Sequence, residues 1–152
     1  MIERIKALLA GRPVEPRRDG RDELTFACVM LLVEAARMDQ RIDPRERAVI
    51  ERLLGERFGL GRETAKALID TALAEAEASN RFFAHTQRVK DGLEAAERVR
   101  MIEMLWEVVL ADGRLDPYED NLLRRVAGLI HVSDAESGAA RQRVKARLAA
   151  AS

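Results

Sequence analysis

Two near-identical stretches decide the fold of this chain: RMDQRIDPRE at residues 37–46 and LADGRLDPYE at residues 110–119. Both follow the pattern D-x-R-[IL]-D-P-x-E, and one interval of 73 residues separates each acidic position of the first stretch from its counterpart in the second. Each stretch follows an apolar segment, Phe26–Val33 or Met104–Leu110, and precedes an amphipathic one. The repeated unit is therefore predicted to be a helix, a sharp acidic turn and a second helix.

The start of the second helix in each unit is the clearest local signal. Asp43 and Asp116 stand at N-cap positions, and a proline follows each of them at the first helical position. Glu46 and Glu119 stand three residues after these caps, as in a capping box. Two helices are therefore predicted to begin at these prolines.

Composition and periodicity predict an all-α fold. The chain has 152 residues, which is enough for one domain with an ordinary core, and it is 47% hydrophobic but only 4% aromatic. We predict about seven helices and no strand, with internally duplicated units packed around two central apolar helices. The predicted division is an amphipathic helix and tether over residues 1–20 and a helical domain over residues 21–152, with repeat halves at about 24–59 and 97–132.

Charge and cysteine content narrow the classes of function. The 26 basic and 26 acidic residues give a formal net charge of zero, which argues against a nucleic-acid-binding protein. The single cysteine, Cys28, lies within an apolar run and is predicted to belong to the core. We see no signal peptide, and the longest apolar run is too short for a transmembrane segment, so we expect a cytoplasmic protein.

The duplicated acidic turns are the candidate site. Hard divalent cations prefer several oxygen ligands, and the stretch from Asp112 to Glu119 is spaced like the second half of an EF-hand loop. The first half is missing, because its ligand positions fall on Val108 and Leu110. A complete EF-hand is therefore excluded, and we expect a weaker Ca²⁺ or Mg²⁺ site that pools six carboxylates: Asp39, Asp43, Glu46, Asp112, Asp116 and Glu119.

Helix capping alone is the competing explanation. An Asp-Pro-x-Glu segment stabilises a helix N-terminus by roughly 1–2 kcal/mol through N-cap hydrogen bonds and the helix dipole. Arg41 and Arg114 are placed to neutralise the remaining acids. Capping accounts less well for Asp39 and Asp112, which precede the caps by four residues. The alternative function is a structural or adaptor domain without a ligand.

The pattern of an apolar helix that ends in D-G-x-[IL]-x-x-x-E, present twice, resembles the TerB-like family of bacterial proteins named for tellurite resistance. The similarity covers about residues 23–148. It implies duplicated, all-helical cytoplasmic domains with an acidic, divalent-cation-binding face, tied to stress responses and to membrane-associated complexes. Gln40 departs from the pattern, because it occupies the position of Gly113 in the other copy. A residue other than glycine makes an EF-like bend harder there.

Other chemistry has little support in the sequence. His85 and His131 are far apart and lack further ligands at zinc-binding spacing, so they are expected at the surface or partly packed. Paired carboxylates could serve a metal-dependent hydrolase, but the sequence shows no Gly-rich phosphate loop. We therefore predict a non-enzymatic module that binds a cation or a partner protein. The basic residues near the C-terminus are expected on a solvated helix face: Arg141, Arg143, Lys145 and Arg147.

Overall fold

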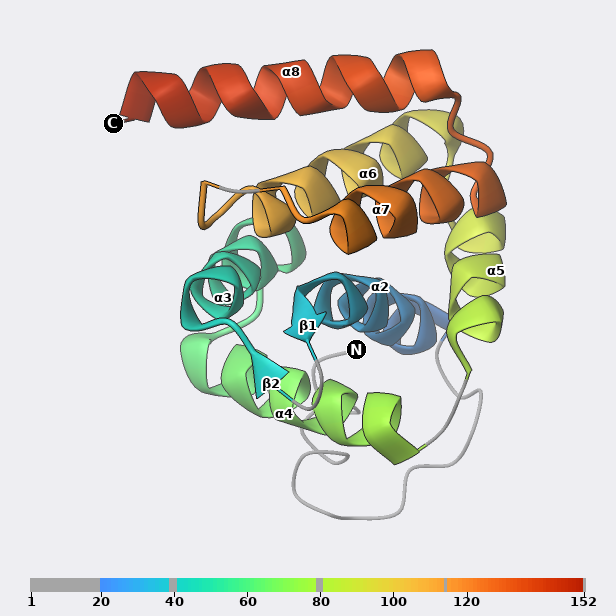
Figure 1. Ribbon diagram of the computed structural model, residues 1–152. Coiled ribbons are helices and arrows are strands. Elements are labelled where there is room, and N and C mark those ends of the chain that lie inside the picture. The colour runs from blue at the N-terminus through green and yellow to red at the C-terminus, as the bar shows by residue number, and fades with distance from the viewer. Residues whose placement is uncertain (1–19, 39–40, 79–80, 114, 152) are drawn as a thin grey trace.

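The computed structural model describes residues 20–38, 41–78, 81–113 and 115–151. This part of the chain contains seven helices, and the predicted all-α class is confirmed. The predicted N-terminal helix and tether lie almost entirely outside the described residues. The helices are α2 (Gly20–Ala36), α3 (Pro44–Phe58), α4 (Arg62–Ala78), α5 (Phe82–Gly92), α6 (Ala95–Val109), α7 (Pro117–Leu129) and α8 (Asp134–Ala151) (Figure 1).

One short β-pairing differs from the prediction that there would be no strand. The two-residue strands β1 (Arg37–Met38) and β2 (Arg41–Ile42) are antiparallel, with Arg37 opposite Ile42. Strands of two residues are too short to produce an alternating pattern of polar and apolar residues, so they were not predictable from periodicity. The pairing joins the end of α2 to the segment that leads into α3.

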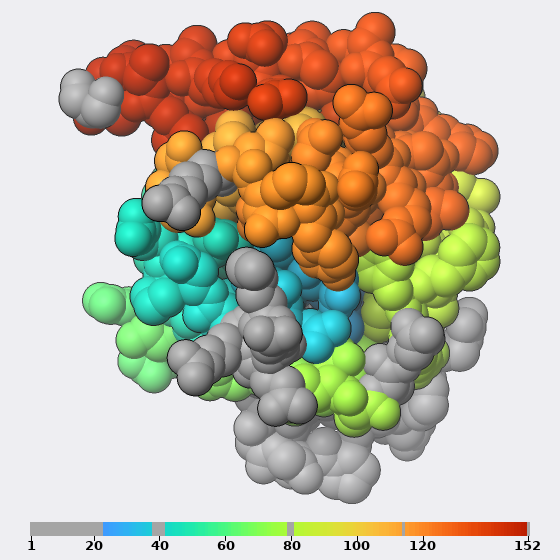
Figure 2. All heavy atoms as spheres, viewed as in Figure 1, coloured from blue at the N-terminus to red at the C-terminus, as the bar shows by residue number. Residues whose placement is uncertain are grey.

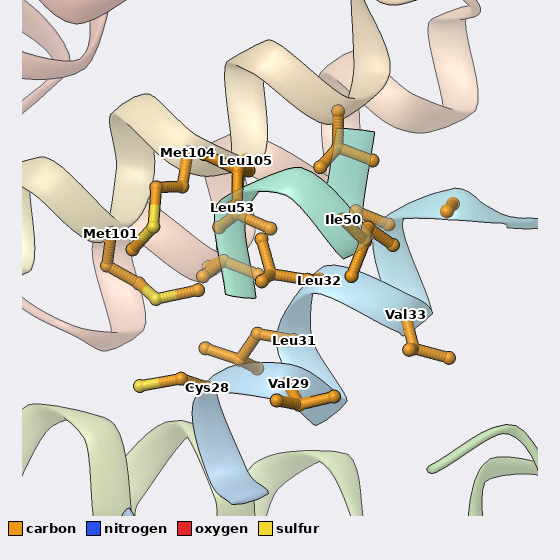
Figure 3. Packing of buried hydrophobic residues seen from close by; sticks show 14 of the residues in the cluster. Cys28, Val29, Leu31, Leu32, Val33, Ile50, Leu53, Met101, Met104 and Leu105 are labelled. Atoms are coloured by element: carbon orange, nitrogen blue, oxygen red, sulfur yellow. The ribbon is translucent and has the colours of Figure 1, made fainter. Parts of the chain in front are cut away.

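The helix α2 lies at the centre of the molecule. It packs against α3, α4, α5, α6 and α7, and Figure 1 shows it enclosed between these helices. Every residue from Ala27 to Val33 is buried, and Cys28 lies in the core as predicted. Leu31 and Leu32 meet side chains of α3 and α6 in one shared cluster (Figure 3). This cluster determines how the ends of α2 and α6 are placed relative to each other.

The helix ends follow the local signals in the sequence. Pro44 and Pro117 occupy the first positions of α3 and α7, as predicted. The helix α3 ends before Gly59, whose φ of 67° is the left-handed conformation that glycine adopts most readily. In the described residues no helix is both long enough and apolar enough to cross a membrane.

The last helix, α8, is held on α6 by one aromatic side chain and a series of ion pairs. Trp106 is buried, its Nε1 donates to Ser137 Oγ over 3.2 Å, and the Arg141 guanidinium lies 5.2 Å from the centre of its ring. Arg143 pairs with Glu103. Arg147 pairs with both Glu103 and Glu107 over 2.7 Å. Arg143, Lys145 and Arg147 are exposed, as expected of a solvated helix face, and Arg141, Arg143 and Arg147 also contact α6.

Glu107 also connects α6 to α3. Its Oε2 accepts a hydrogen bond from Arg52 over 2.7 Å, while its Oε1 accepts from Arg147. The carboxylate is buried and charged groups from two other helices compensate its charge. The sequence did not indicate this role, because Glu107 and its two partners lie on three separate helices.

Replacing Trp106 with alanine is expected to lower the free energy of unfolding by roughly 3–5 kcal/mol, because it empties a large volume between α6 and α8. The measurement is urea denaturation followed by circular dichroism, since Trp106 is the only tryptophan and fluorescence would be lost. Phe83→Ala is the control, because Phe83 is 60% exposed and should cost less than about 0.5 kcal/mol. A loss of less than about 1 kcal/mol for Trp106→Ala would show that the tryptophan does not hold α8.

Candidate metal centre

The two acidic turns approach each other at one end of the central helices. Asp43 precedes α3, Glu46 lies in its first turn, and Asp112 lies in the segment between α6 and α7. Each offers a carboxylate oxygen, and these oxygens all lie within 4.8 Å of one another. Atoms of α3 and of the segment between α6 and α7 meet at the molecular surface (Figure 2). We name Asp43, Glu46 and Asp112 the acidic centre.

Local backbone geometry positions Asp112. The backbone N–H of Gly113 donates to the carbonyl of Leu110 over 3.1 Å, which closes a tight turn after α6. Gly113 has a φ of 79°, a conformation that residues with a side chain rarely adopt. The glycine therefore lets the chain turn directly after Asp112. Gln40, its counterpart in the first copy, lies outside the described residues.

The carboxylates of the second copy are engaged in helix capping. Asp116 Oδ1 accepts a hydrogen bond from the backbone N–H of Tyr118 over 2.7 Å. Glu119 Oε1 accepts from the backbone N–H of Asp116 over 3.2 Å, which completes a capping box. For Asp116 and Glu119, capping is therefore a sufficient explanation of their position.

Glu46 differs from its counterpart Glu119. Asp43 caps α3 by accepting from the backbone N–H groups of Arg45 and Glu46 over 2.8 and 3.3 Å. Among the described residues, however, no capping bond returns from the Glu46 side chain to the backbone of Asp43. Glu46 is only 3% exposed, and its Oε1 has no hydrogen-bond partner in the part of the chain that the structure describes. A buried polar atom without a partner costs free energy, so this oxygen is where a ligand would be stabilising.

Electrostatics make Glu46 the most perturbed acid of the centre. Burial, together with the nearby charges of Glu119, Asp112 and Asp43 and the contact with the Glu119 carboxyl group, raises the pKa of Glu46 to about 8. Burial likewise raises the pKa of Glu119, although the backbone N–H of Asp116 opposes the shift. The direction of both shifts favours the protonated form of these two carboxyl groups when no cation is bound.

The structure places the six predicted ligands in three groups. The acidic centre brings together Asp43, Glu46 and Asp112. Glu119 is hydrogen-bonded to this centre through Glu46, and Asp116 lies beside it as a helix cap. Asp39 lies outside the described residues, as do the side chains of Arg41 and Arg114, which the capping explanation required. Whether any of the six binds a metal ion stays a prediction.

Replacing Glu46 with glutamine is expected to stabilise the cation-free protein at about pH 8 by on the order of 2 kcal/mol and to have less effect at about pH 5. The pKa of Glu46 is raised from its ordinary value of 4.5 to about 8 in the folded protein. The protonated side chain therefore makes its full contribution to stability below about pH 4.5. That contribution is lost as the pH rises through about 8, whereas glutamine has no proton to lose. The measurement is urea denaturation with a chelator present.

The matched control for this experiment is Glu136→Gln. Glu136 holds the same position in a capping box, where its Oε1 accepts from the backbone of Ser133 over 3.0 Å, but it is exposed. Hydrogen bonds from the backbone and side chain of Ser133 lower the pKa of Glu136, so removing its charge should reduce stability at both pH values. A Glu46→Gln effect that is the same at both pH values would show that Glu46 is already ionised at neutral pH.

Comparison with known proteins identifies the family. The model of the family described as tellurite resistance protein TerB matches residues 25–142 of this chain. The comparisons with curated proteins and with solved structures gave no match. The matched range includes the whole acidic centre and both helices that carry it, so the resemblance inferred from the acidic turns is confirmed: the chain belongs to the TerB family.

Proposed function

We propose that this protein is a non-enzymatic cytoplasmic module that binds a hard divalent cation, Ca²⁺ or Mg²⁺, through Asp43, Glu46 and Asp112. The observation that carries the proposal is the buried Glu46 carboxyl group, which lies close to two other acids and whose Oε1 has no partner among the described residues. Capping does not account for this group. Carboxylate oxygens are the ligands that both cations prefer.

A cation would compensate the charge that the fold concentrates here. Carboxylate oxygens of these three residues lie within 4.8 Å of one another, and none of the ion pairs between described residues joins Asp43 or Glu46 to an arginine or lysine. Asp112 also has a further interaction within the protein. A divalent cation supplies positive charge at the centre, where Glu46 otherwise keeps a proton.

The affinity is expected to be low. Ca²⁺ takes six to eight oxygen ligands and Mg²⁺ takes six, whereas the acidic centre supplies three side chains. Asp43 already uses one oxygen to cap α3. The segment before Asp112 adds no side-chain oxygen, because Val108 and Leu110 are apolar. Water would complete the coordination shell, and we expect a Kd of roughly 0.1–1 mM.

A cation at this position would join two parts of the fold. Asp43 and Glu46 belong to the start of α3, whereas Asp112 belongs to the segment between α6 and α7. Binding would therefore order the surface between the two duplicated units. We propose this surface as the place where a partner protein is recognised in a stress or tellurite-resistance-type response.

A structural or adaptor role without a ligand is the second candidate. The observation that favours it is the complete capping box of Asp116 and Glu119, which uses both acids without a cation. This reading extends to Asp43, whose carboxylate caps α3. It does not extend to Glu46, and the two candidates therefore differ in what happens when that side chain is changed.

Isothermal titration with Ca²⁺ and, separately, with Mg²⁺ tests the proposal. The native chain is expected to bind one ion and to gain thermal stability at millimolar concentrations, because a ligand of the folded state stabilises it by mass action. Asp112→Asn and Glu46→Gln should each weaken binding by roughly tenfold or more, since each removes a charged ligand.

Asp120→Asn is the matched control, because Asp120 lies in the first turn of α7 but pairs with Arg124 over 3.6 Å instead of facing the centre. It removes the same charge from the same region and should leave the affinity within about twofold of native. A flat titration of the native chain at millimolar Ca²⁺ and Mg²⁺ would favour the structural role. Equal losses for Asp120→Asn and Asp112→Asn would indicate a diffuse charge effect.

A further inference from the structure

A buried imidazole joins two helices that have few contacts with each other. His85 of α5 is 3% exposed, and its Nε2 lies 3.1 Å from Oε2 of Glu75 in α4. Both helices pack against α2 (Figure 1), whereas α4 and α5 hardly touch one another in the part of the chain that the structure describes. The hydrogen bond between His85 and Glu75 is therefore a principal direct connection between α4 and α5.

The second ring nitrogen of His85 lies in surroundings that suit only the neutral ring. An ionised carboxylate only accepts hydrogen bonds, so Nε2 carries the proton of the neutral imidazole and Nδ1 carries none. Nδ1 is shielded from solvent and has no hydrogen-bond partner among the described residues. The Phe26 ring packs edge-on against the imidazole, with 6.1 Å between the ring centres. A proton on Nδ1 would therefore create a buried, charged N–H group for which the described residues supply no acceptor.

A small cavity lies beside His85. Its volume is about 40 Å³, which is room for a water molecule, and His85 forms part of its wall. Three charged side chains line it as well: Glu34 of α2, Arg37 of β1 and Arg81 at the start of α5. Glu34 accepts a hydrogen bond from Arg37 over 3.2 Å. Water is thus able to come close to the imidazole, although Nδ1 itself stays out of its reach in the folded arrangement.

The charges around His85 act in opposite directions, and burial decides between them. Burial has the largest effect and lowers the pKa of His85 from its ordinary value of 6.5; the Glu75 carboxylate opposes this shift, and the charges of Arg81 and Arg88 add to it. Arg88 is paired with Glu23 of α2 over 3.8 Å. The folded chain therefore disfavours an imidazolium that the unfolded segment forms at about pH 6.5.

We propose that His85 and Glu75 form an acid-sensitive latch, which fastens α5 to α4 while the imidazole is neutral and releases α5 when Nδ1 takes up a proton from solvent. The new N–H group needs an acceptor, and water reaches Nδ1 only when α5 moves away from α2 and α4. The latch is complete above about pH 6.5 and weakens as the pH falls below that value, because only the released segment takes up the proton readily. It does not depend on the acidic centre.

Hydrogen exchange of the backbone amides of α5 tests the latch in the full chain. NMR gives protection factors, which correct for the intrinsic effect of pH on exchange, at about pH 7.5 and about pH 5.5. Protection in α5 is expected to fall by roughly five- to tenfold between these values, since one pH unit below 6.5 changes proton uptake by the released segment about tenfold. Protection in α8, which does not pack against α5, should change by less than about twofold.

Three variants assign the effect to one imidazole. His85→Gln keeps a donor for Glu75 but has no proton to gain, so its α5 protection should be equal at both pH values within about twofold. Glu75→Gln keeps an acceptor for Nε2 but removes the charge that favours the imidazolium, so its loss of protection should equal or exceed the native loss. His131→Asn is the matched control, because His131 is the other histidine, is exposed, and has a φ of 61° that asparagine tolerates. It should behave as the native chain does.

Equal protection of α5 at both pH values in the native chain would overturn the latch, because the fold would then accept the imidazolium in place. A native-like loss in His85→Gln would overturn it as well, since another group would be responsible. If His85→Gln does not fold, which thermal denaturation checks, a loss in Glu75→Gln smaller than the native loss has the same meaning. The acidic centre does not imitate the effect, because protonation of Glu46 stabilises the folded chain as the pH falls.

Discussion

The burial of α2 is the constraint on which the rest of the structure depends. A helix whose residues from Ala27 to Val33 are all buried must be covered on every side, and five other helices provide that cover. Its packing against α6 brings the ends of two central helices together. The acidic turns follow those ends directly, so their carboxylates converge as a consequence of core packing. The burial of apolar side chains in α2 and α6 therefore offsets the repulsion between the carboxylates of the acidic centre.

Signals that act within a few residues predicted much of this fold. The Asp-Pro pairs predicted the starts of α3 and α7, and composition and periodicity predicted about seven helices, as the described residues have them. Interactions between distant helices were not predictable in this way. His85 was expected at the surface or partly packed, but it is buried against Glu75 of α4, with 3.1 Å between Nε2 and Oε2. A single sequence does not show which helices become neighbours.

The candidate site was also predictable only in part, for the same reason. The repeat identified the acids, and it treated Glu46 and Glu119 as equivalent because their local sequences are equivalent. The structure separates them, since Glu119 completes a capping box and Glu46 turns to the acidic centre. That difference depends on how the segment after α6 lies against α3, which is a property of tertiary packing. Only the exchange of glycine for Gln40 hinted at an asymmetry between the copies.

The Glu107 carboxylate has a mechanical consequence for the acidic centre. Because it is bonded to Arg52 of α3 and to Arg147 of α8 at once, it resists sliding of α6 along either neighbour. The three helices are therefore linked through one carboxylate, and Asp112 follows the end of α6 at Val109 by three residues. Because the turn at Gly113 begins directly after Asp112, the position of this acid relative to α3 follows from the position of α6, which Glu107 helps to hold.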